Sequence, residues 1–224
     1  YFLSTRFFSH LSVSMTAALL RVALFWSALK YSPPRLHTQP AKVEMLGTKS
    51  NKTVADYMKL PEETRCEHID GEFFMSPSPT TTHQSIVLHL AIRLTEFVEA
   101  QALVKVFVSP LDCVLSDYDV AQPDVLFVAH EHISRIEKYI SGPPDLAVEV
   151  LSKGHQERDR IVKRELYARS GVAEYWIVDP EAKSIEVFSN ERGTFRGAGF
   201  FSGEDVLEST LLAGLRLRLR DIFA

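Results

Sequence analysis

Cysteine is scarce in this sequence and fits no known pattern. The chain of 224 residues contains two cysteines, Cys66 and Cys113. Two cysteines are too few for a disulfide framework, and these two lack the spacing of metal ligands. We therefore expect both to be packing residues of a protein in a reducing, cytoplasmic compartment.

Acidic residues are absent from the first 43 positions. The basic residues there are Arg6, Arg21, Lys30, Arg35 and Lys42, so this segment carries +5. Because the whole chain carries −4, the remaining 181 residues carry −9. An acidic domain disfavours tight, non-specific binding to nucleic acid, and any contact with DNA would need a local basic patch.

No run of apolar residues is long enough for a comfortable membrane span. The stretch 16–29 is apolar except for Arg21. A spanning helix needs about 20 apolar residues, and a central arginine adds about 2.5–3.5 kcal/mol to the cost of insertion. We therefore expect no membrane-spanning segment.

The segment 1–44 is unlike the rest of the chain and has three interpretations. It is a secretory or anchor segment, a transit-like peptide rich in Arg and Ser, or translated sequence upstream of a start at Met45 or Met15. A regular pattern begins just after Met45. We favour the third interpretation and predict one domain over residues 45–224, with 1–44 as a non-domain extension.

The apolar pattern of this domain alternates between helical and strand spacing. Capping residues and spacing predict three helices: 53–60, 82–100 with Thr82 as its cap, and 156–169, which stops at Ser170-Gly171. Strands are expected at 67–73 (a hairpin around Asp70-Gly71), 104–108 paired with 111–115, 124–128, 146–151, 174–178, 185–188 and 215–219. The order predicts an α/β or α+β domain in which helices flank a mixed sheet.

Two of these strands are nearly all apolar, and each carries one carboxylate. Asp124 follows Gln122-Pro123 at the start of one, and Glu149 lies inside the other. A buried, ionised carboxylate is costly unless it is paired or binds a cation. Side by side, the two acids would form a site of hard oxygen ligands suited to Mg²⁺ or Mn²⁺. The alternatives are a turn or cap role for Asp124 and, for Glu149, an ion pair with a basic residue of the next helix: Arg158, Arg160 or Lys163.

A lysine follows in that helix. Lys163 lies beside the apolar stripe of Val162 and Leu166, so its stem can run along the sheet toward Glu149. Two acids and a lysine suit phosphodiester hydrolysis, because the acids hold a divalent ion and the lysine stabilises charge that develops on the phosphate. The alternative is an ion pair between Asp159 and Lys163, four residues apart on one helix face and in the favourable order.

Further polar residues are weaker candidates for the same site. They are Glu67 and Glu72 in the hairpin, His83 in the first turn of the long helix, Gln122, and Tyr167 one turn beyond the lysine. Each also has an ordinary structural explanation, since exposed hairpin acids, capping histidines and core tyrosines are common. The segment 153–169 holds six basic residues against three acids and is the best local patch for facing phosphate.

The same residues carry a resemblance to a known family. The matching motifs are Ile69-Asp70-Gly71-Glu72 with His83-Gln84, Pro123 to Val128, Pro144 to Ser152, Glu157 to Lys163, Tyr167 to Val172, and Glu174 to Pro180. From about Val54 to Phe223 the chain resembles the Uma-two family of restriction endonucleases, within the PD-(D/E)xK nuclease superfamily.

The resemblance implies a restriction-endonuclease-like fold and Mg²⁺-dependent cleavage of DNA, with Mn²⁺ as the other suitable ion. By analogy, Asp124 is the PD aspartate and Glu149 the second acid, and both bind the metal. The chain departs from the superfamily pattern at Leu151, where a lysine is expected. The resemblance implies a migrated lysine, for which Lys163 is the best position. Since nuclease folds of this kind often act as dimers, a homodimer is also an open expectation.

Three functions compete at this point. The leading hypothesis is a metal-dependent DNA endonuclease that uses Asp124, Glu149 and Lys163. The second is a catalytically inactive binding or regulatory module that keeps the nuclease fold, which the charge of −9 and Leu151 favour. The third is a hydrolase for another phosphodiester or a nucleotide. The sequence shows no helix-turn-helix or zinc-finger reader of DNA, so it does not predict a target sequence.

Overall fold

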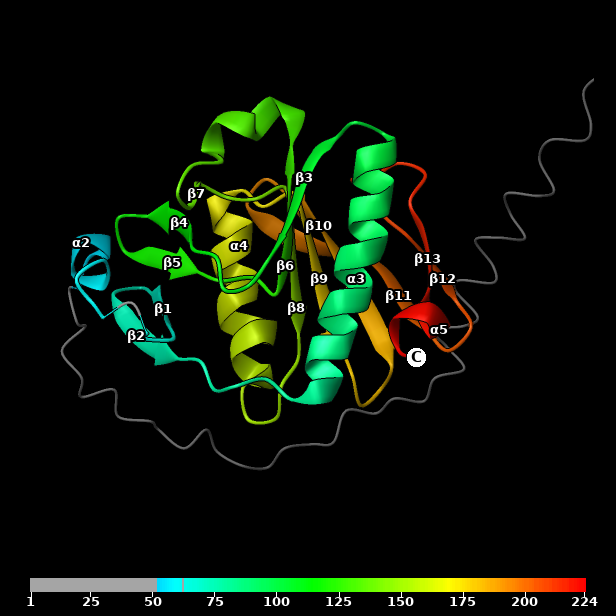
Figure 1. Ribbon diagram of the computed structural model, residues 1–224, viewed down its shortest axis with the longest axis horizontal. Helices are drawn as coiled ribbons and strands as arrows, with labels where there is room; N and C mark the ends of the chain where they lie inside the picture. Colours follow the sequence, from blue (N-terminus) through cyan, green and yellow to red (C-terminus); the bar gives the residue numbers. More distant parts are fainter. Residues whose placement is uncertain (1–51, 62) are drawn as a thin grey trace, which may run out of the picture. The chain divides into compact units, whose positions relative to one another are not determined.

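A six-stranded mixed sheet forms the centre of the domain (Figure 1). The computed structural model describes residues 52–61 and 63–224, so the predictions for 1–44 lie outside the described residues. Neighbouring strands are antiparallel except β8 and β9, which run parallel. In spatial order the strands are β11 (Thr194–Ser202), β10 (Ser184–Glu191), β9 (Glu174–Asp179), β8 (Leu146–Val150), β6 (Val125–Ala129) and β3 (Val104–Val108).

The two acid-bearing strands occupy the interior of this sheet. β6 and β8 are neighbours, and nearly every residue in them is buried. Their near-continuous apolar sequence is typical of strands covered on both faces. The prediction that they are central strands is therefore confirmed, and it explains why the two acid-bearing segments lie side by side.

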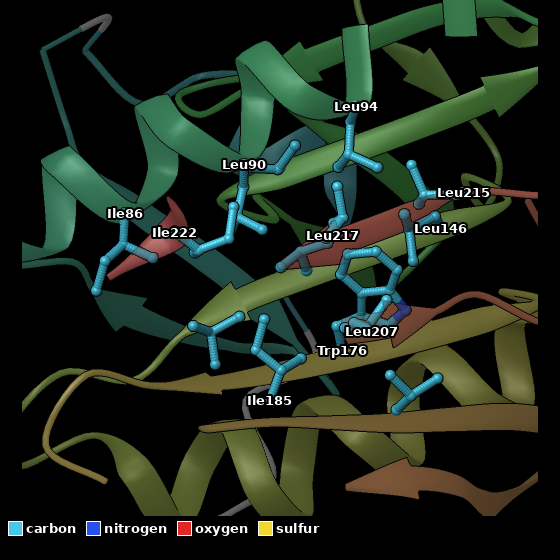
Figure 2. Close-up of a cluster of buried hydrophobic side chains, with 14 of the residues drawn as sticks. Ile86, Leu90, Leu94, Leu146, Trp176, Ile185, Leu207, Leu215, Leu217 and Ile222 are labelled. Carbon is cyan, nitrogen blue, oxygen red and sulfur yellow. The ribbon is translucent and has the colours of Figure 1, made fainter. Parts of the chain in front are cut away.

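One face of the sheet is covered by the long helix α3 (Thr81–Ala100) and by the C-terminal elements β12 (Val206–Glu208), β13 (Arg216–Arg218) and α5 (Leu219–Ile222). Figure 2 shows how this layer meets the sheet: Leu90 and Leu94 of α3 lie near Trp176 of β9. As predicted, Leu215, Leu217 and Leu219 are buried. The strand is shorter than predicted, because Leu219 already belongs to α5.

The cap of helix α3 lies two residues earlier than predicted. The cap is Thr80, whose side-chain hydroxyl accepts a hydrogen bond from the backbone N of His83 at 3.2 Å, and Thr82 lies inside the helix. Pro79 precedes a residue in extended conformation, which favours a cap at Thr80. His83 lies in the first turn, as predicted.

The other face is covered by a helical segment in two parts. Residues Arg158–Lys163 form a π-helix, η2, and α4 (Arg164–Ser170) continues it. The predicted end at Ser170-Gly171 is confirmed, because Gly171 adopts a left-handed conformation with φ 93°. The π-helix was not predicted, since the wider i to i+5 turn leaves no mark in apolar spacing.

A second, five-stranded sheet borders this helical face. Its strands lie in the order β2 (Glu72–Met75), β1 (Cys66–Ile69), β5 (Asp119–Ala121), β4 (Cys113–Ser116) and β7 (Ile140–Ser141). The hairpin at Asp70-Gly71 is confirmed, with Ile69 opposite Glu72 and positive φ at both turn residues. The short helix α2 (Val54–Tyr57) and the 3₁₀ segment η1 (His130–Arg135) complete the described elements.

The predicted pairing of 104–108 with 111–115 is wrong. β3 pairs with β6 in the large sheet, whereas β4 pairs with β5 and β7 in the small one. The segment around Pro110 leads the chain from one sheet to the other. Strand-like composition shows that a segment has a face to bury, but it does not identify the neighbouring strand. β11 was not predicted, because Gly197 and Gly199 weaken its strand signal.

Among the described residues, no helix combines the length and the apolar character that crossing a bilayer requires.

The contact between α3 and the sheet predicts an unequal cost for two leucines on that helix. Leu90 is fully buried and Leu88 is 58% exposed. Leu90→Ala should lower the free energy of unfolding by about 2–5 kcal/mol, because it leaves a cavity in the cluster of Figure 2. Leu88→Ala should change it by no more than about 0.5 kcal/mol. Urea unfolding of both variants checks this, and equal losses would contradict the packing.

Candidate active site

Glu149 lies at the centre of a buried polar cluster on the helical face of the sheet. It shares that face with Ala147 and Leu151, and it is 3% exposed. Its Oε1 accepts hydrogen bonds from Lys163 Nζ at 2.9 Å and from the Tyr167 hydroxyl at 2.6 Å. The predicted proximity of Glu149 and Lys163 is therefore present, in the form of a buried ion pair.

Asp124 lies across from Glu149 in the sheet. Val125 is paired with Val148, and continuing this antiparallel register places Asp124 opposite Glu149 on the same face. Its Oδ2 accepts a hydrogen bond from the backbone N of Val150 at 2.8 Å and lies 3.2 Å from His83 Nε2. Neighbouring strands thus bring the two predicted acids together, and α3 adds His83.

The π-helix directs two charged residues into the same cluster. Asp159 and Lys163 are both buried, and 3.8 Å separates Asp159 Oδ1 from Lys163 Nζ. The Tyr175 hydroxyl donates to the backbone carbonyl of Asp159 at 3.0 Å. The ion pair between Asp159 and Lys163 that was the alternative explanation for the lysine is therefore also present, and it is buried within the cluster.

Glu67 is a member of the cluster that the sequence ranked too low. It is 1% exposed, and its Oε1 lies 2.9 Å from Lys163 Nζ and accepts from the backbone N of Gln122 at 2.9 Å. Glu72, ranked equally, is exposed in the edge strand β2 and stays outside the cluster. Glu67 differs from Glu72 because β1 is a fully buried strand, which no pattern in the sequence indicates.

The other accessory candidates divide into two groups. Tyr167 reaches Glu149, and His83 reaches Asp124. The side chain of Gln122 points elsewhere, because its Nε2 donates to Asp112 Oδ1 at 2.7 Å and to the Tyr57 hydroxyl at 3.3 Å. Gln122 therefore meets the cluster through its backbone alone.

Burial and mutual charge shape the ionisation of the cluster. Burial raises the pKa of Glu149 well above its ordinary value, and the neighbouring Asp124 and Asp159 add to this while Lys163 opposes it. Burial opposes the charge of Lys163, but Glu149 and Glu67 outweigh it and raise the pKa of the lysine. The lysine therefore stays protonated. Burial also raises the pKa of Asp159.

The cluster holds more negative than positive charge. Four carboxylates, on Glu67, Asp124, Glu149 and Asp159, face the cations Lys163 and Arg158 together with His83. Within 52–61 and 63–224, the buried atoms Glu67 Oε2 and Asp159 Oδ1 have no hydrogen-bond donor. Arg158 lies 3.5 Å from Glu67 Oε2 and 3.9 Å from Asp159 Oδ1 without a hydrogen bond to either. The excess of carboxylates over cations, rather than these two oxygens, therefore suits the cluster to a further cation.

The cluster is not a ready-made metal cage. In the described part of the chain, no three His, Cys, Asp or Glu side chains are arranged to hold a metal ion by themselves. Mg²⁺ is commonly held by one or two carboxylates and keeps several waters. The pair Asp124 and Glu149 therefore fits that ion in number and type of ligand.

A mixed sheet lies between two covering layers, its neighbouring central strands carry acids, and a buried lysine comes from the covering helix. This arrangement is that of a restriction-endonuclease-like nuclease fold. The family model described as "Uma2: Putative restriction endonuclease" matches residues 54–220, and the chain belongs to this family.

A solved structure has the same fold. The crystal structure of "a putative nuclease belonging to DUF820 from Anabaena variabilis ATCC 29413" superposes with a TM-score of 0.66 at 22% identity. The alignment covers 76% of this chain and 97% of that one. No protein with curated annotation shows significant similarity.

The ion pairs of Lys163 predict a large loss of stability when its charge is removed. Lys163→Met leaves Glu149 as an unpaired buried charge and leaves Glu67 with Arg158 alone, which should cost about 3–5 kcal/mol near neutral pH. The loss should shrink as the pH falls, because Glu149 then takes up a proton. Lys153→Met is the control, since that lysine is 88% exposed and forms a surface ion pair with Glu181. Chemical denaturation of both variants at several pH values measures these changes in the free energy of unfolding. Similar losses of stability in the two variants would refute a structural role for the buried ion pairs.

The contact between His83 and Asp124 predicts a second way in which stability depends on pH. Burial disfavours its charge, but the hydrogen bond and charge of Asp124 outweigh burial and raise its pKa above 6.5. The interaction stabilises the folded protein fully when the pH is below the pKa of His83 in the unfolded chain, near 6.5. This stabilisation is lost as the pH rises through the higher pKa of His83 in the folded protein. His83→Gln should remove this part of the pH dependence, which unfolding curves without divalent metal will measure. A wild-type profile unchanged by the substitution would argue against the interaction.

Proposed function

We propose that this protein is a metal-dependent endonuclease that hydrolyses phosphodiester bonds in DNA, with Asp124, Glu149 and Lys163 as its catalytic residues. The observation that carries the proposal is the position of Asp124 opposite Glu149 on neighbouring strands, with Lys163 Nζ 2.9 Å from Glu149 Oε1. Membership of the Uma2 family supports it.

Asp124 and Glu149 would hold Mg²⁺ or Mn²⁺. Hydrogen bonds from the described residues use Oδ2 of Asp124 and Oε1 of Glu149, which leaves the other oxygen of each carboxylate for a cation. A divalent ion bound there would polarise the phosphate and lower the pKa of a bound water. His83 and the backbone N of Val150 hold the orientation of Asp124.

Lys163 would stabilise the negative charge that develops on the phosphate during hydrolysis. Its ammonium has three hydrogen-bond donors, and its contacts with Glu67 and Glu149 use two. Within the described residues the third makes no hydrogen bond, although Asp159 Oδ1 lies 3.8 Å from the ammonium. Because the lysine stays protonated, it acts as a fixed positive charge rather than as a base.

A second candidate function is a nuclease-fold module that binds without cleaving. The observation in its favour is Leu151, which occupies the position of the superfamily lysine and is buried in the apolar core. Lys163 is also neutralised by acids on two sides. Such a module would show neither cleavage nor dependence on the two acids for binding.

Cleavage assays separate the two functions. The full chain should nick supercoiled plasmid or cut single-stranded DNA with Mg²⁺ or Mn²⁺ and should be inactive with EDTA. Asp124→Ala and Glu149→Ala should each lower the rate at least about 100-fold, since each removes a group that acts on the reacting phosphate or its metal. Glu99→Ala removes an exposed acid of α3 and is the control.

Loss of activity in both acid variants but not in the control would establish the site. A folded wild-type protein that cleaves neither substrate with any metal would instead favour the binding module or a different phosphodiester. Sedimentation of the same protein with and without DNA will show whether a homodimer supplies a second site for the opposite strand.

A further inference from the structure

Two fully buried tyrosines lie side by side behind the site and differ in one contact. The rings of Tyr167 on α4 and Tyr175 on β9 are 5.2 Å apart and meet edge to face. The Tyr167 hydroxyl donates to Glu149 Oε1 at 2.6 Å, whereas the Tyr175 hydroxyl donates to the backbone carbonyl of Asp159 at 3.0 Å. Two tyrosines in the same core thus differ in their hydrogen-bond acceptor, which is a carboxylate for Tyr167 and a backbone carbonyl for Tyr175.

The orientation of the Glu149 carboxylate depends on its hydrogen-bond donors. The last torsion of a glutamate is soft and broad, so packing alone does not fix it. Lys163 divides its hydrogen bonds between Glu149 and Glu67, so it does not serve the Glu149 carboxylate alone. Tyr167 is rigid, because its ring is fully buried and packs against Tyr175, which in turn stacks on Phe195.

Tyr167 and Lys163 both donate to the same oxygen of Glu149. This leaves Oε2, the oxygen that the proposed function gives to the metal, as the one the described residues do not bond. A carboxylate ligand held by a fixed donor loses less freedom when a metal binds, and partners of this kind are typically worth about 10–100-fold in metal affinity.

We propose that Tyr167 is a positioning residue that turns Oε2 of Glu149 toward the divalent metal ion and so sets the affinity of the site for it. The inference rests on the proposed function, because it assigns Tyr167 a task at the metal site proposed there. A purely structural tyrosine would instead contribute stability alone, as Tyr175 does through the carbonyl of Asp159.

The test compares Tyr167→Phe with Tyr175→Phe in the full chain. Each substitution removes one buried hydroxyl and keeps the ring, so both lose stability in thermal unfolding. Calorimetric titration with Mn²⁺ should show a Kd about 10-fold or more higher in Tyr167→Phe and a wild-type Kd in Tyr175→Phe. The Mn²⁺ concentration for half-maximal cleavage should rise in parallel, while the rate at saturating Mn²⁺ changes much less.

The outcomes separate this inference from the proposed function. A wild-type protein that neither binds Mn²⁺ nor cleaves DNA overturns both. Wild-type binding with equal Kd values in the two tyrosine variants overturns the inference alone, and so does a Tyr167→Phe variant that loses only its rate at saturating metal. If Tyr167→Phe does not fold, Tyr167→Met, which also removes the hydroxyl and fills the space with a flexible apolar chain, takes its place in the same comparison.

Discussion

A single buried ammonium joins acids from three separate parts of the chain. Lys163 Nζ contacts Glu149 on β8 and Glu67 on β1 and lies near Asp159 on its own helix. None of these charges is tolerated in a protein interior alone, because the desolvation of one ion costs several kcal/mol. The small sheet, the large sheet and the covering helix must therefore meet at this point, or the site carries unpaired charge.

The helix that carries Lys163 has the local geometry that these buried ion pairs require. Asp159 and Lys163 both lie in the π-helix, and both side chains are buried. The Tyr175 hydroxyl donates to the backbone carbonyl of Asp159 in the same turn. Irregular helical turns of this kind often occur at functional sites, and here the turn supplies the lysine.

The sequence predicted the features that depend on local pattern. Asp124 and Glu149 were identifiable because a carboxylate inside an apolar strand demands a partner, and those two strands are neighbours in the central sheet. Features set by tertiary contact were not identifiable. Glu67 has the sequence context of an ordinary hairpin acid, and its role depends on the contact between β1 and the helix that carries Lys163. The predicted partner of β3 was wrong, because composition does not specify strand order.

The absence of a lysine at Leu151 has a structural explanation. Leu151 follows Glu149 by two residues on the same face, and its side chain packs in the apolar cluster that contains Tyr167 and Leu166. A lysine at that position would insert a charge among these side chains, with the ammonium competing with Tyr167 for Glu149. Because the π-helix delivers Lys163 to Glu149 from across the layer, position 151 is free to be apolar. In this chain the core packing at position 151 and the cation beside Glu149 thus come from different elements.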